Sequence, residues 1–272
     1  MQVAVIGAGA MGSAVGATLA AHGAEVLTPL EGRSAATKAR ALAANMRDAS
    51  WAECARCDVA LSIVASSQAV PVAQAFVAAL GDAQPVFVEC NAIQPAKARD
   101  IAALFDGTGA GFADAGIVGG PPSSDGTRGP LFYVSGPDAR RVMVLAGYGL
   151  SFEQLGAPVG AASALKLCFA GTSKGQTALL AMLTLLAVRE GVDEAFLAQL
   201  ARTNPGFLEW GARQARRLSA VSARWAEEMD EIALFAADLA GAADQFAALE
   251  TFFGGLAQNR EQTALLGEIF SD

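Results

Sequence analysis

The sequence contains very little histidine, and this scarcity excludes several kinds of active site. The single histidine, His22, lies at the expected end of a helix, where we expect a capping or solvated role. One histidine rules out most histidine-based metal sites and every catalytic triad that needs a properly placed histidine. We therefore expect no metal site, and acid–base chemistry has to come from another residue type.

Cysteine is also scarce, with four residues in the chain. Cys54 and Cys57 form a C-x-x-C pair, but neither a thioredoxin-like context nor a second ligand pair accompanies it. We interpret the pair as a chance spacing on a short helix rather than as a redox or zinc site.

The chain has no excess of positive charge, no long apolar run and no leader pattern. Its net charge of -8 argues against binding to nucleic acid or to an anionic membrane surface. The N-terminus has no basic region typical of a signal peptide, and no apolar stretch reaches membrane-spanning length. We therefore expect a soluble, cytoplasmic protein.

The order of expected elements predicts two domains within 272 residues. Strands and helices alternate through residues 1–158, which predicts an α/β Rossmann domain with a mostly parallel, doubly wound sheet. Residues 159–272 show only helical periodicity, beginning with one long helix that ends at Gly191. The Pro- and Gly-rich stretch 120–130 is expected to be a loop inside the first domain.

A glycine-rich segment follows the first expected strand. Gly7, Gly9 and Gly12 form G-x-G-x-x-G at a strand–helix junction, which is the context that a dinucleotide-binding loop requires. Gly7 permits the turn, Gly9 lets a pyrophosphate approach, and Gly12 allows close helix packing. Ala10 and Met11 would add backbone amides at the helix start. The alternative is a glycine-rich turn without a ligand.

The end of the second expected strand bears on the choice between NAD and NADP. Thr28 stands where an acidic residue would bind the ribose hydroxyls of NAD, and Arg33 and Ser34 follow in the loop. This local basic character favours the 2'-phosphate of NADP. Glu31 leaves NAD possible, and a solvated helix start is the alternative interpretation of Arg33.

One lysine lies inside an apolar run. Lys166 in SALKLCFAG shares a helix face with Ser163 and with other small residues, and this flat stripe suits a ligand. Either Lys166 reaches solvent from a core helix, or it faces a cavity where its proton is used, with a pKa moved toward working pH by burial. Lys174 could reach the same cavity or solvent.

Three segments resemble the β-hydroxyacid dehydrogenase superfamily, which includes 6-phosphogluconate and 3-hydroxyisobutyrate dehydrogenases. They are IGAGAMGSA at residues 6–14, DAGIVGG at 114–120 and GAASALKLCFAG at 160–171. The resemblance covers nearly the whole chain. Shorter segments such as KGQTAL and RWAEEMDEIA resemble a bacterial subgroup whose C-terminal domain has no assigned function.

The resemblance implies roles for particular residues. Lys166 would be the proton-transfer residue, and the amides of Gly119 and Gly120 would hold a substrate carboxylate. The nicotinamide ribose would lie beside two loops that contain Val64, Ala65, Ser66 and Asn91. Ser163 and Lys174 are further substrate-binding candidates. The resemblance also implies a homodimer in which the helical domain completes the partner's cleft.

The chain departs from the superfamily pattern at several substrate positions. Val118 replaces the usual serine before the two glycines, and Ala170 replaces the usual asparagine one turn after the lysine. These changes predict a bulkier or less polar substrate. Four C-terminal residues could line such a pocket or belong to the core, namely Phe207, Trp210, Trp225 and Met229.

Together these features predict an NADP-dependent oxidoreductase. It would transfer a hydride between nicotinamide and a hydroxyacid or a related alcohol or carbonyl compound, with Lys166 as general acid and base. Two alternatives stay open. One is imine reduction on the same scaffold, against which the lysine counts, and the other is a catalytically idle NADP-binding sensor or partner protein.

Overall fold

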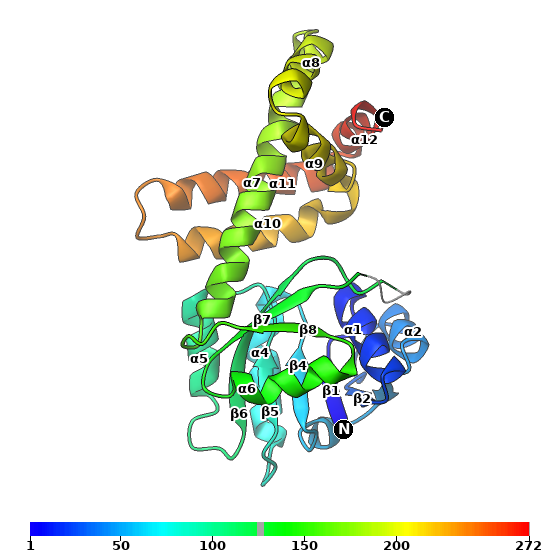
Figure 1. Ribbon diagram of the computed structural model, residues 1–272, viewed down its shortest axis with the longest axis vertical. Helices are drawn as coiled ribbons and strands as arrows, with labels where there is room; N and C mark the ends of the chain where they lie inside the picture. Colours follow the sequence, from blue (N-terminus) through cyan, green and yellow to red (C-terminus); the bar gives the residue numbers. More distant parts are fainter. Residues whose placement is uncertain (124–127, 272) are drawn as a thin grey trace. The chain divides into compact units, whose positions relative to one another are not determined.

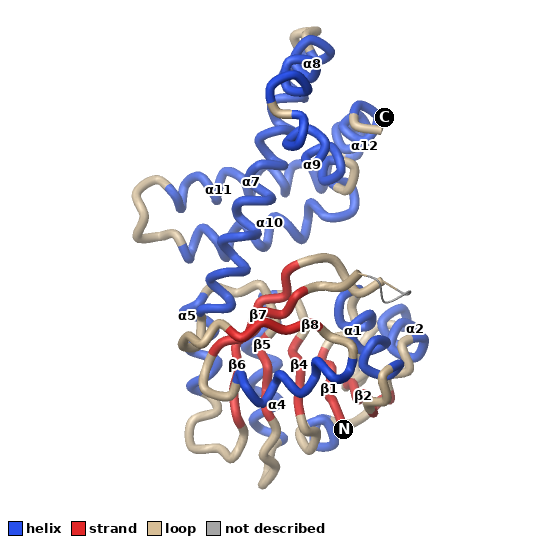
Figure 2. The backbone as a smooth tube through the Cα atoms, in the orientation of Figure 1, coloured by secondary structure: helices blue, strands red, loops and turns tan. Residues whose placement is uncertain are grey.

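The computed structural model describes residues 1–123 and 128–271. Its internal contacts divide the chain into two compact units, Met1–Lys166 and Leu167–Asp272. All strands lie in the first unit, and the described part of the second unit is helical (Figure 2). This is the predicted fold class, an α/β domain followed by an all-helical region. The boundary between the units falls inside a long helix, whereas the sequence pattern placed it before residue 159.

The first unit is built on one eight-stranded sheet with the order β3-β2-β1-β4-β5-β6-β7-β8 (Figure 1). Neighbouring strands are parallel except for β6 and β7, which are antiparallel. The strands are β1 (Gln2–Ile6), β2 (Glu25–Thr28), β3 (Arg47–Asp48), β4 (Val59–Ser62), β5 (Val86–Glu89), β6 (Gly111–Val118), β7 (Leu131–Ser135) and β8 (Ser151–Gln154).

Helices cover both faces of this sheet, so its central strands are buried on both sides. Along β1, Val3 and Val5 join one core while Ala4 and Ile6 join the other, because successive side chains point to opposite faces. The helices are α1 (Ala10–Ala21), α2 (Ala35–Ala43), α3 (Trp51–Cys54), α4 (Ala69–Ala79), α5 (Pro95–Ala103) and α6 (Ala139–Val142), with 3-10 turns η1 (Ser66–Gln68) and η2 (Met143–Tyr148).

The order of the strands creates a switch point between β1 and β4. The chain runs from β1 outward through β2 and β3, then returns to β4 on the other side of β1. Ligands of open α/β sheets bind outside the carboxyl ends of the strands at such a point. The loops after β1, β4 and β5 therefore define the edge of the sheet where a cofactor site is expected.

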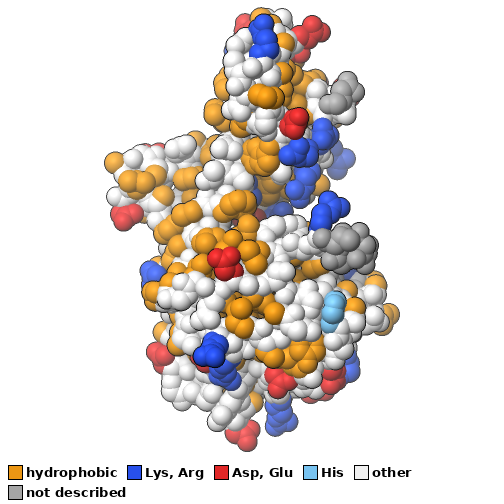
Figure 3. Space-filling model, in the orientation of Figure 1, with side chains coloured by type: hydrophobic (Ala, Val, Ile, Leu, Met, Phe, Trp, Pro, Cys, Tyr) orange, Lys and Arg blue, Asp and Glu red, His pale blue; other side chains and the backbone are white. Residues whose placement is uncertain are grey.

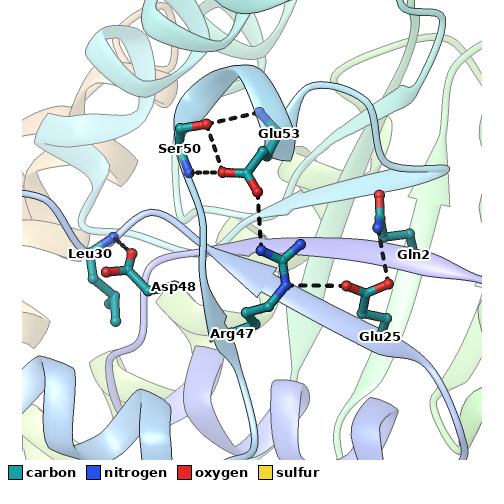
Figure 4. Close-up of polar contacts among 7 residues, drawn as sticks. All are labelled: Gln2, Glu25, Leu30, Arg47, Asp48, Ser50 and Glu53. Atoms are coloured by element: carbon teal, nitrogen blue, oxygen red, sulfur yellow. Dashed lines mark hydrogen bonds and ion pairs between the residues drawn. The ribbon is translucent and has the colours of Figure 1, made fainter.

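The edge of the sheet at β3 is held by surface charges (Figure 4). Arg47 bonds Glu25 of β2 at 3.2 Å and Glu53 of α3 at 3.1 Å. Glu53 also accepts the backbone N–H of Ser50 at 2.8 Å, and Ser50 in turn caps α3. These bonds, with that of the Ser50 backbone foremost, lower the pKa of Glu53 to about 2. An open cleft of about 310 Å³ lies beside this network.

The C-x-x-C pair belongs to the second core of the sheet and lies at the end of α3. Cys54 and Cys57 are buried and form no disulfide. Burial raises the pKa of each thiol to about 12, so neither is a ready nucleophile or metal ligand. Within the described ranges, no three metal-ligating side chains of the His, Cys, Asp or Glu type come together.

The second unit is a set of packed helices that begins within α7 (Ala161–Arg189). Antiparallel α10 and α11 contact each other extensively, and α7 approaches them at Gly171 and Gly175. A side chain at Gly171 would press on Phe246 and Ile232. The other helices are α8 (Asp193–Thr203), α9 (Pro205–Ala215), α10 (Leu218–Phe235), α11 (Ala242–Gln258) and α12 (Arg260–Ile269).

None of the helices in the described parts of the chain has both the length and the apolar character needed to cross a membrane. The predicted loop 120–130 includes residues 124–127, which lie outside the described residues. On its two sides, β6 ends at Val118 and β7 begins at Leu131, close to the limits of that predicted loop.

Candidate functional site

The glycine loop connects β1 to α1 and requires glycine at two positions. Gly7 has φ +112°, and a side chain there would overlap the carbonyl of Ile63. A side chain at Gly12 would overlap the carbonyl of Gly7, so α1 packs directly on the turn. At Gly9, by contrast, no described atom lies within 4 Å of where a Cβ would be. The loop is closed toward the protein and open on its outer side.

The start of α1 is free to bind an anion. Gly9 is its N-cap, and within α1, which is described in full, no side chain caps the first turn and no acidic residue lies in it. Ala10 and Met11 contribute their backbone amides to this turn. Amides of a helix N-terminus, together with the helix dipole, favour a phosphate. The loop therefore fits the pyrophosphate of a dinucleotide.

The residues expected to select the cofactor lie after β2. Thr28 is fully buried, and its hydroxyl has no hydrogen-bond partner among the described residues, so its role toward a cofactor stays a prediction. Ser34 is exposed and caps α2 through the N–H of Thr37, while Arg33 is partly exposed. Arg40 of α2 donates to the carbonyl of Ala8 at 3.1 Å, which brings a further guanidinium to the glycine loop.

Asn91 ties the loop after β4 to the loop after β5. Its side-chain oxygen accepts the N–H of Val64 at 2.6 Å, and its amide nitrogen donates to the hydroxyl of Ser62 at 3.0 Å. Ala65 and Ser66 continue the β4 loop into η1. The sequence grouped these residues through resemblance, and the structure brings Asn91 and Val64 into direct contact.

Four polar side chains form a row across the sheet at the end of these strands. The register pairs Ser62 of β4 with Glu89 of β5, Glu89 with Asp114 of β6, and Asp114 with Ser135 of β7. Residues paired in this way present their side chains to the same face. All four are fully buried. We call these four residues the polar row.

Asp114 anchors the first turn of α7. Its carboxylate accepts the N–H groups of Gly160 at 2.9 Å and of Ser163 at 3.0 Å, and the hydroxyl of Ser163 at 2.6 Å. A fourth bond comes from the hydroxyl of Ser135 at 3.0 Å. Amides at a helix start have no partner within the helix, and a carboxylate is well suited to bind them. Ser163, a predicted substrate residue, donates its hydroxyl hydrogen bond to Asp114.

Lys166 lies one turn after this anchor. Helix α7 passes close to β6, because a side chain at Gly116 would strike the carbonyl of Ala162 and the Cβ of Lys166. The amine of Lys166 donates to the carbonyl oxygen of Cys90 at 3.3 Å. Cys90 directly follows β5 and precedes Asn91. The structure thus brings Lys166 to the same edge of the sheet as the β4 and β5 loops.

Glu89 is a buried acid that the sequence patterns did not single out as part of the site. One carboxylate oxygen accepts the N–H of Asn91 at 2.8 Å, and the other has no partner among the described residues. Burial raises the pKa of Glu89 to about 8. The signal was present in the sequence, since Glu89 ends an apolar strand much as Lys166 interrupts an apolar helix.

The predicted substrate glycines lie directly after β6. Gly119 has φ +118° and packs on Pro130, a conformation that side chains rarely adopt. No described atom lies within 4 Å of the Cβ position of Gly120. Gly119 therefore turns the chain, and the backbone of Gly120 is open to an approaching group.

Lys174 has a local partner in the second unit. Its amine forms an ion pair with Glu228 of α10 and lies 5.7 Å from the ring centre of Trp225. Burial lowers the pKa of Lys174, an effect that Glu228 opposes. Trp225 also packs edge-on against Phe253, and Met229 is fully buried. These residues form a packed interior around the pair.

Phe207 and Trp210, the other two aromatic candidates, lie on α9. Their rings stack with centres 6.5 Å apart, and both residues are partly exposed. Neither residue lines the cavity of about 890 Å³ that lies between α7, α10 and α11. The role of these aromatic residues toward a substrate stays a prediction.

Comparisons with known proteins agree with this site. Residues 2–146 match the model of the NAD-binding domain of 6-phosphogluconate dehydrogenase, and residues 187–256 match a domain of unknown function. The solved structure of conserved protein MTH1747, described as similar to 3-hydroxyacid dehydrogenases, is 29% identical with a TM-score of 0.74 and covers 98% of this chain and 99% of that chain.

More distant structures share the fold. Mycobacterium tuberculosis 3-hydroxyisobutyrate dehydrogenase with L-serine is 18% identical, with a TM-score of 0.74 and 98% of each chain covered. An imine reductase variant from Myxococcus stipitatus with NAD+ is 19% identical, with a TM-score of 0.61 and 98% of each chain covered. No curated protein sequence matches the chain.

The first match spans more than half of the chain and contains the glycine loop, the β4 and β5 loops and the polar row. The chain belongs to the β-hydroxyacid dehydrogenase superfamily, among the 6-phosphogluconate dehydrogenase-like NAD(P)-binding proteins whose C-terminal domain has no assigned function.

Proposed function

We propose that this protein is an NADP-dependent oxidoreductase that interconverts a hydroxy compound and its carbonyl form, with Lys166 as general acid and base. The observation that carries the proposal is the placement of the Lys166 amine on the Cys90 carbonyl. That carbonyl lies at the carboxyl end of β5, in the same unit and on the same sheet edge as the glycine loop.

The residues of the first unit have distinct tasks in this proposal. The glycine loop and the start of α1 hold the pyrophosphate, and Asn91 fixes the loops beside the nicotinamide ribose. Bound NADP supplies or accepts the hydride. Lys166 takes the hydroxyl proton of the substrate during oxidation and returns it during reduction. Such acid–base help is typically worth about 10² to 10⁴ in rate.

The amides of Gly119 and Gly120 would position the substrate. The proposal gives them a carboxylate or another small anionic or carbonyl group of the substrate, because Gly120 leaves its backbone uncovered. Val118 removes a hydroxyl from this segment, so the substrate would be less polar there than a simple hydroxyacid. A hydroxyacid with an apolar substituent, or the corresponding aldehyde or ketone, fits this description.

NADP is favoured over NAD by the side chains around the β2 loop. Arg33 and Arg40 bring two guanidinium groups to this region, and Arg40 contacts the glycine loop. The strand itself ends in Thr28 rather than in an acid, and the carboxylate nearest in the register, that of Asp48 on β3, is bonded to the N–H of Leu30 at 3.1 Å. Arg33→Ala should weaken NADPH binding at least tenfold and change NADH binding little.

A homodimer is part of the proposal. In Figure 3, hydrophobic side chains gather along α7. Leu179, Leu183 and Leu186 are exposed on one side of this helix, at the i, i+4 and i+7 spacing of a continuous face. An apolar stripe of this kind beside a cavity of about 890 Å³ suits the same face of a second copy.

The test is a turnover assay with matched lysine variants. Purified protein is mixed with NADPH or NADP+ and a panel of hydroxyacids, alcohols, aldehydes, ketones, keto acids and imines. We expect turnover with a hydroxy–carbonyl pair, loss of more than 100-fold in Lys166→Met, and nearly full activity in Lys97→Met, a variant on α5 of the same unit. NADPH should bind all three proteins alike.

Other outcomes would point elsewhere. Turnover of imines that survives in Lys166→Met would favour imine reduction instead. NADPH binding without turnover over the whole panel would favour a sensor. Loss of NADPH binding together with activity in Lys166→Met would mean that Lys166 is structural.

A further inference from the structure

Glu89 is a fully buried acid that forms few hydrogen bonds with the rest of the protein. It lies in the middle of the polar row, with Ser62 on one side and Asp114 on the other. Yet it accepts one hydrogen bond, from the N–H of Asn91, and its second oxygen is without a partner among the described residues. Burying a polar atom without a hydrogen bond costs free energy.

Asp114, the neighbouring acid in the row, shows the opposite environment. It accepts four hydrogen bonds, which come from two backbone amides and two hydroxyls at the start of α7 and on β7. The two carboxyl groups lie on adjacent strands but have different surroundings. Asp114 has several hydrogen-bond donors around it, whereas Glu89 has almost none. Divergent environments of this kind separate a structural acid from one that changes its protonation.

Three titratable groups lie near Glu89. Asp114 acts from β6 and Lys166 acts from α7, while Cys90 directly follows β5 and its thiol belongs to the core on the opposite face of the sheet. The negative charge of Asp114 opposes ionisation of Glu89, and Lys166 favours it. Burial raises the pKa of Cys90 well above its usual range, so this thiol stays neutral. Of the three groups, Lys166 alone brings a positive charge.

We propose that Glu89 is a positioning residue that sets the protonation state of Lys166, the two side chains titrating as one coupled pair. Ionised Glu89 favours the ammonium form of Lys166, and protonated Glu89 favours the amine. The geometry is a lysine held on the carbonyl of Cys90, directly after the residue that carries the buried acid. The coupling itself does not need turnover, and its catalytic meaning rests on the proposed function.

The pair would keep the buried edge free of net charge during the reaction. In oxidation the amine of Lys166 would take the hydroxyl proton of the substrate, while a bound nicotinamide cofactor would accept the hydride. Glu89 then releases its own proton to water, so an ammonium–carboxylate pair replaces an amine–acid pair. In reduction Lys166 returns its proton to the developing alkoxide, and Glu89 takes a proton from water. A neutral pair avoids the cost of isolating one charge away from solvent.

The test measures the titration of Lys166 without a substrate. Wild type, Glu89→Gln and the control Asp82→Asn, which removes an exposed acid of the same unit, are labelled with trace acetic anhydride from pH 5 to pH 11. Mass spectrometry of the peptides gives the labelling rate of each lysine. We expect Glu89→Gln to lower the titration midpoint of Lys166 by about one pH unit. At a pH below the midpoint, Lys166 should then be labelled about tenfold faster than in wild type.

The internal controls are Lys38 and Lys97, whose curves should not move in any variant. Glutamine keeps the acceptor for the N–H of Asn91, so the local backbone is preserved in Glu89→Gln. Identical Lys166 curves in wild type and Glu89→Gln would overturn the proposal. A Lys166 curve that moves equally in Asp82→Asn would overturn it too, because the effect would then be general.

A second measurement covers the case in which Glu89→Gln does not fold. In protein with ¹³C-labelled glutamate carboxyls, the Glu89 resonance, assigned with Glu89→Asp, is titrated in wild type and in Lys166→Met. We expect the midpoint of Glu89 to rise when the lysine is removed, and an unchanged midpoint would refute the coupling. Neither measurement uses turnover, so an inactive protein with coupled titrations would reject only the dehydrogenase proposal.

Discussion

The hydroxyl of Ser163 donates a 2.6 Å hydrogen bond to the carboxylate of Asp114, and this bond fastens the first turn of α7 to β6. The contact is fully buried and lies one turn before Lys166. The position of the candidate catalytic lysine therefore depends on a short polar contact within the first unit. The stability and the chemistry of the site are linked through it.

Replacing this serine should weaken the anchor. Ser163→Ala removes one donor from a buried carboxylate, and we expect a loss of about 1 to 3 kcal/mol in the free energy of unfolding. Urea unfolding followed by circular dichroism measures the change. Ser151→Ala, at an exposed position of β8, should stay within about 0.5 kcal/mol. Equal effects of the two substitutions would contradict the anchoring role of Ser163.

Two alanine substitutions in the glycine loop should separate folding from cofactor binding. Gly12→Ala drives a side chain into the carbonyl of Gly7, so both stability and NADPH affinity should fall. Gly9→Ala meets open space, so its thermal midpoint should stay near that of wild type while the Kd for NADPH rises at least tenfold. Calorimetry and fluorescence titration measure the two quantities. An unchanged NADPH affinity in Gly9→Ala would contradict the proposal that this loop binds the pyrophosphate.

Glu89 should give the stability of the protein a distinctive dependence on pH. Its pKa is raised from 4.5 to about 8 in the folded protein, so the folded state holds a proton that the unfolded state has lost. This contribution is fully present below pH 4.5 and is lost as the pH rises to about 8. Glu89→Gln does not titrate and should gain about 3 to 5 kcal/mol relative to wild type over this range. A stability difference that stays constant from pH 5 to pH 9 would be incompatible with this account.

Replacing one partner of the ion pair between Lys174 and Glu228 should lower the free energy of unfolding more than replacing both partners. Lys174→Met leaves Glu228 buried without its lysine, and we expect a loss of about 3 kcal/mol. The double variant Lys174→Met with Glu228→Leu should recover most of that loss, because no buried charge is left behind. Chemical unfolding of wild type, the two single variants Lys174→Met and Glu228→Leu, and the double variant gives the coupling energy. Additive effects would show that the two side chains act independently.

The proposed dimer can be tested on the exposed face of α7. Leu183→Asp puts a charge in the middle of the leucine stripe and should convert a dimer into a monomer in light scattering at micromolar concentration. Val144→Asp places the same charge on an exposed apolar residue of the first unit and should leave the dimer intact. A monomeric wild-type protein would end this part of the proposal.

Most of the fold could be predicted because the sequence patterns are local. The alternation of apolar strands and helices and the long run after Gly160 specify the parallel sheet and α7 without reference to distant residues. Strands β3 and β8 escaped prediction for physical reasons. β3 has two residues, both exposed, and the exposed residues of β8 show no apolar alternation, so each is made a strand by its neighbour.

The site was predictable in part. The glycine spacing predicts the cofactor loop because only glycine meets the steric requirements at Gly7 and Gly12, so the residue type itself is the signal. The partners of Lys166 and Ser163 were not predictable, since Cys90 and Asp114 come from distant strands and meet them only through the register of the sheet. The buried state of Thr28 likewise follows from packing against other elements rather than from its own segment.

The cysteine distribution has a practical consequence for experiments on α7. Cys54, Cys57 and Cys90 are buried, whereas Cys168, two residues after Lys166, is exposed. A maleimide dye added to the native protein should therefore mark a single position on this helix. The rate of that labelling would report whether this stretch of α7 is accessible to solvent or covered by another molecule.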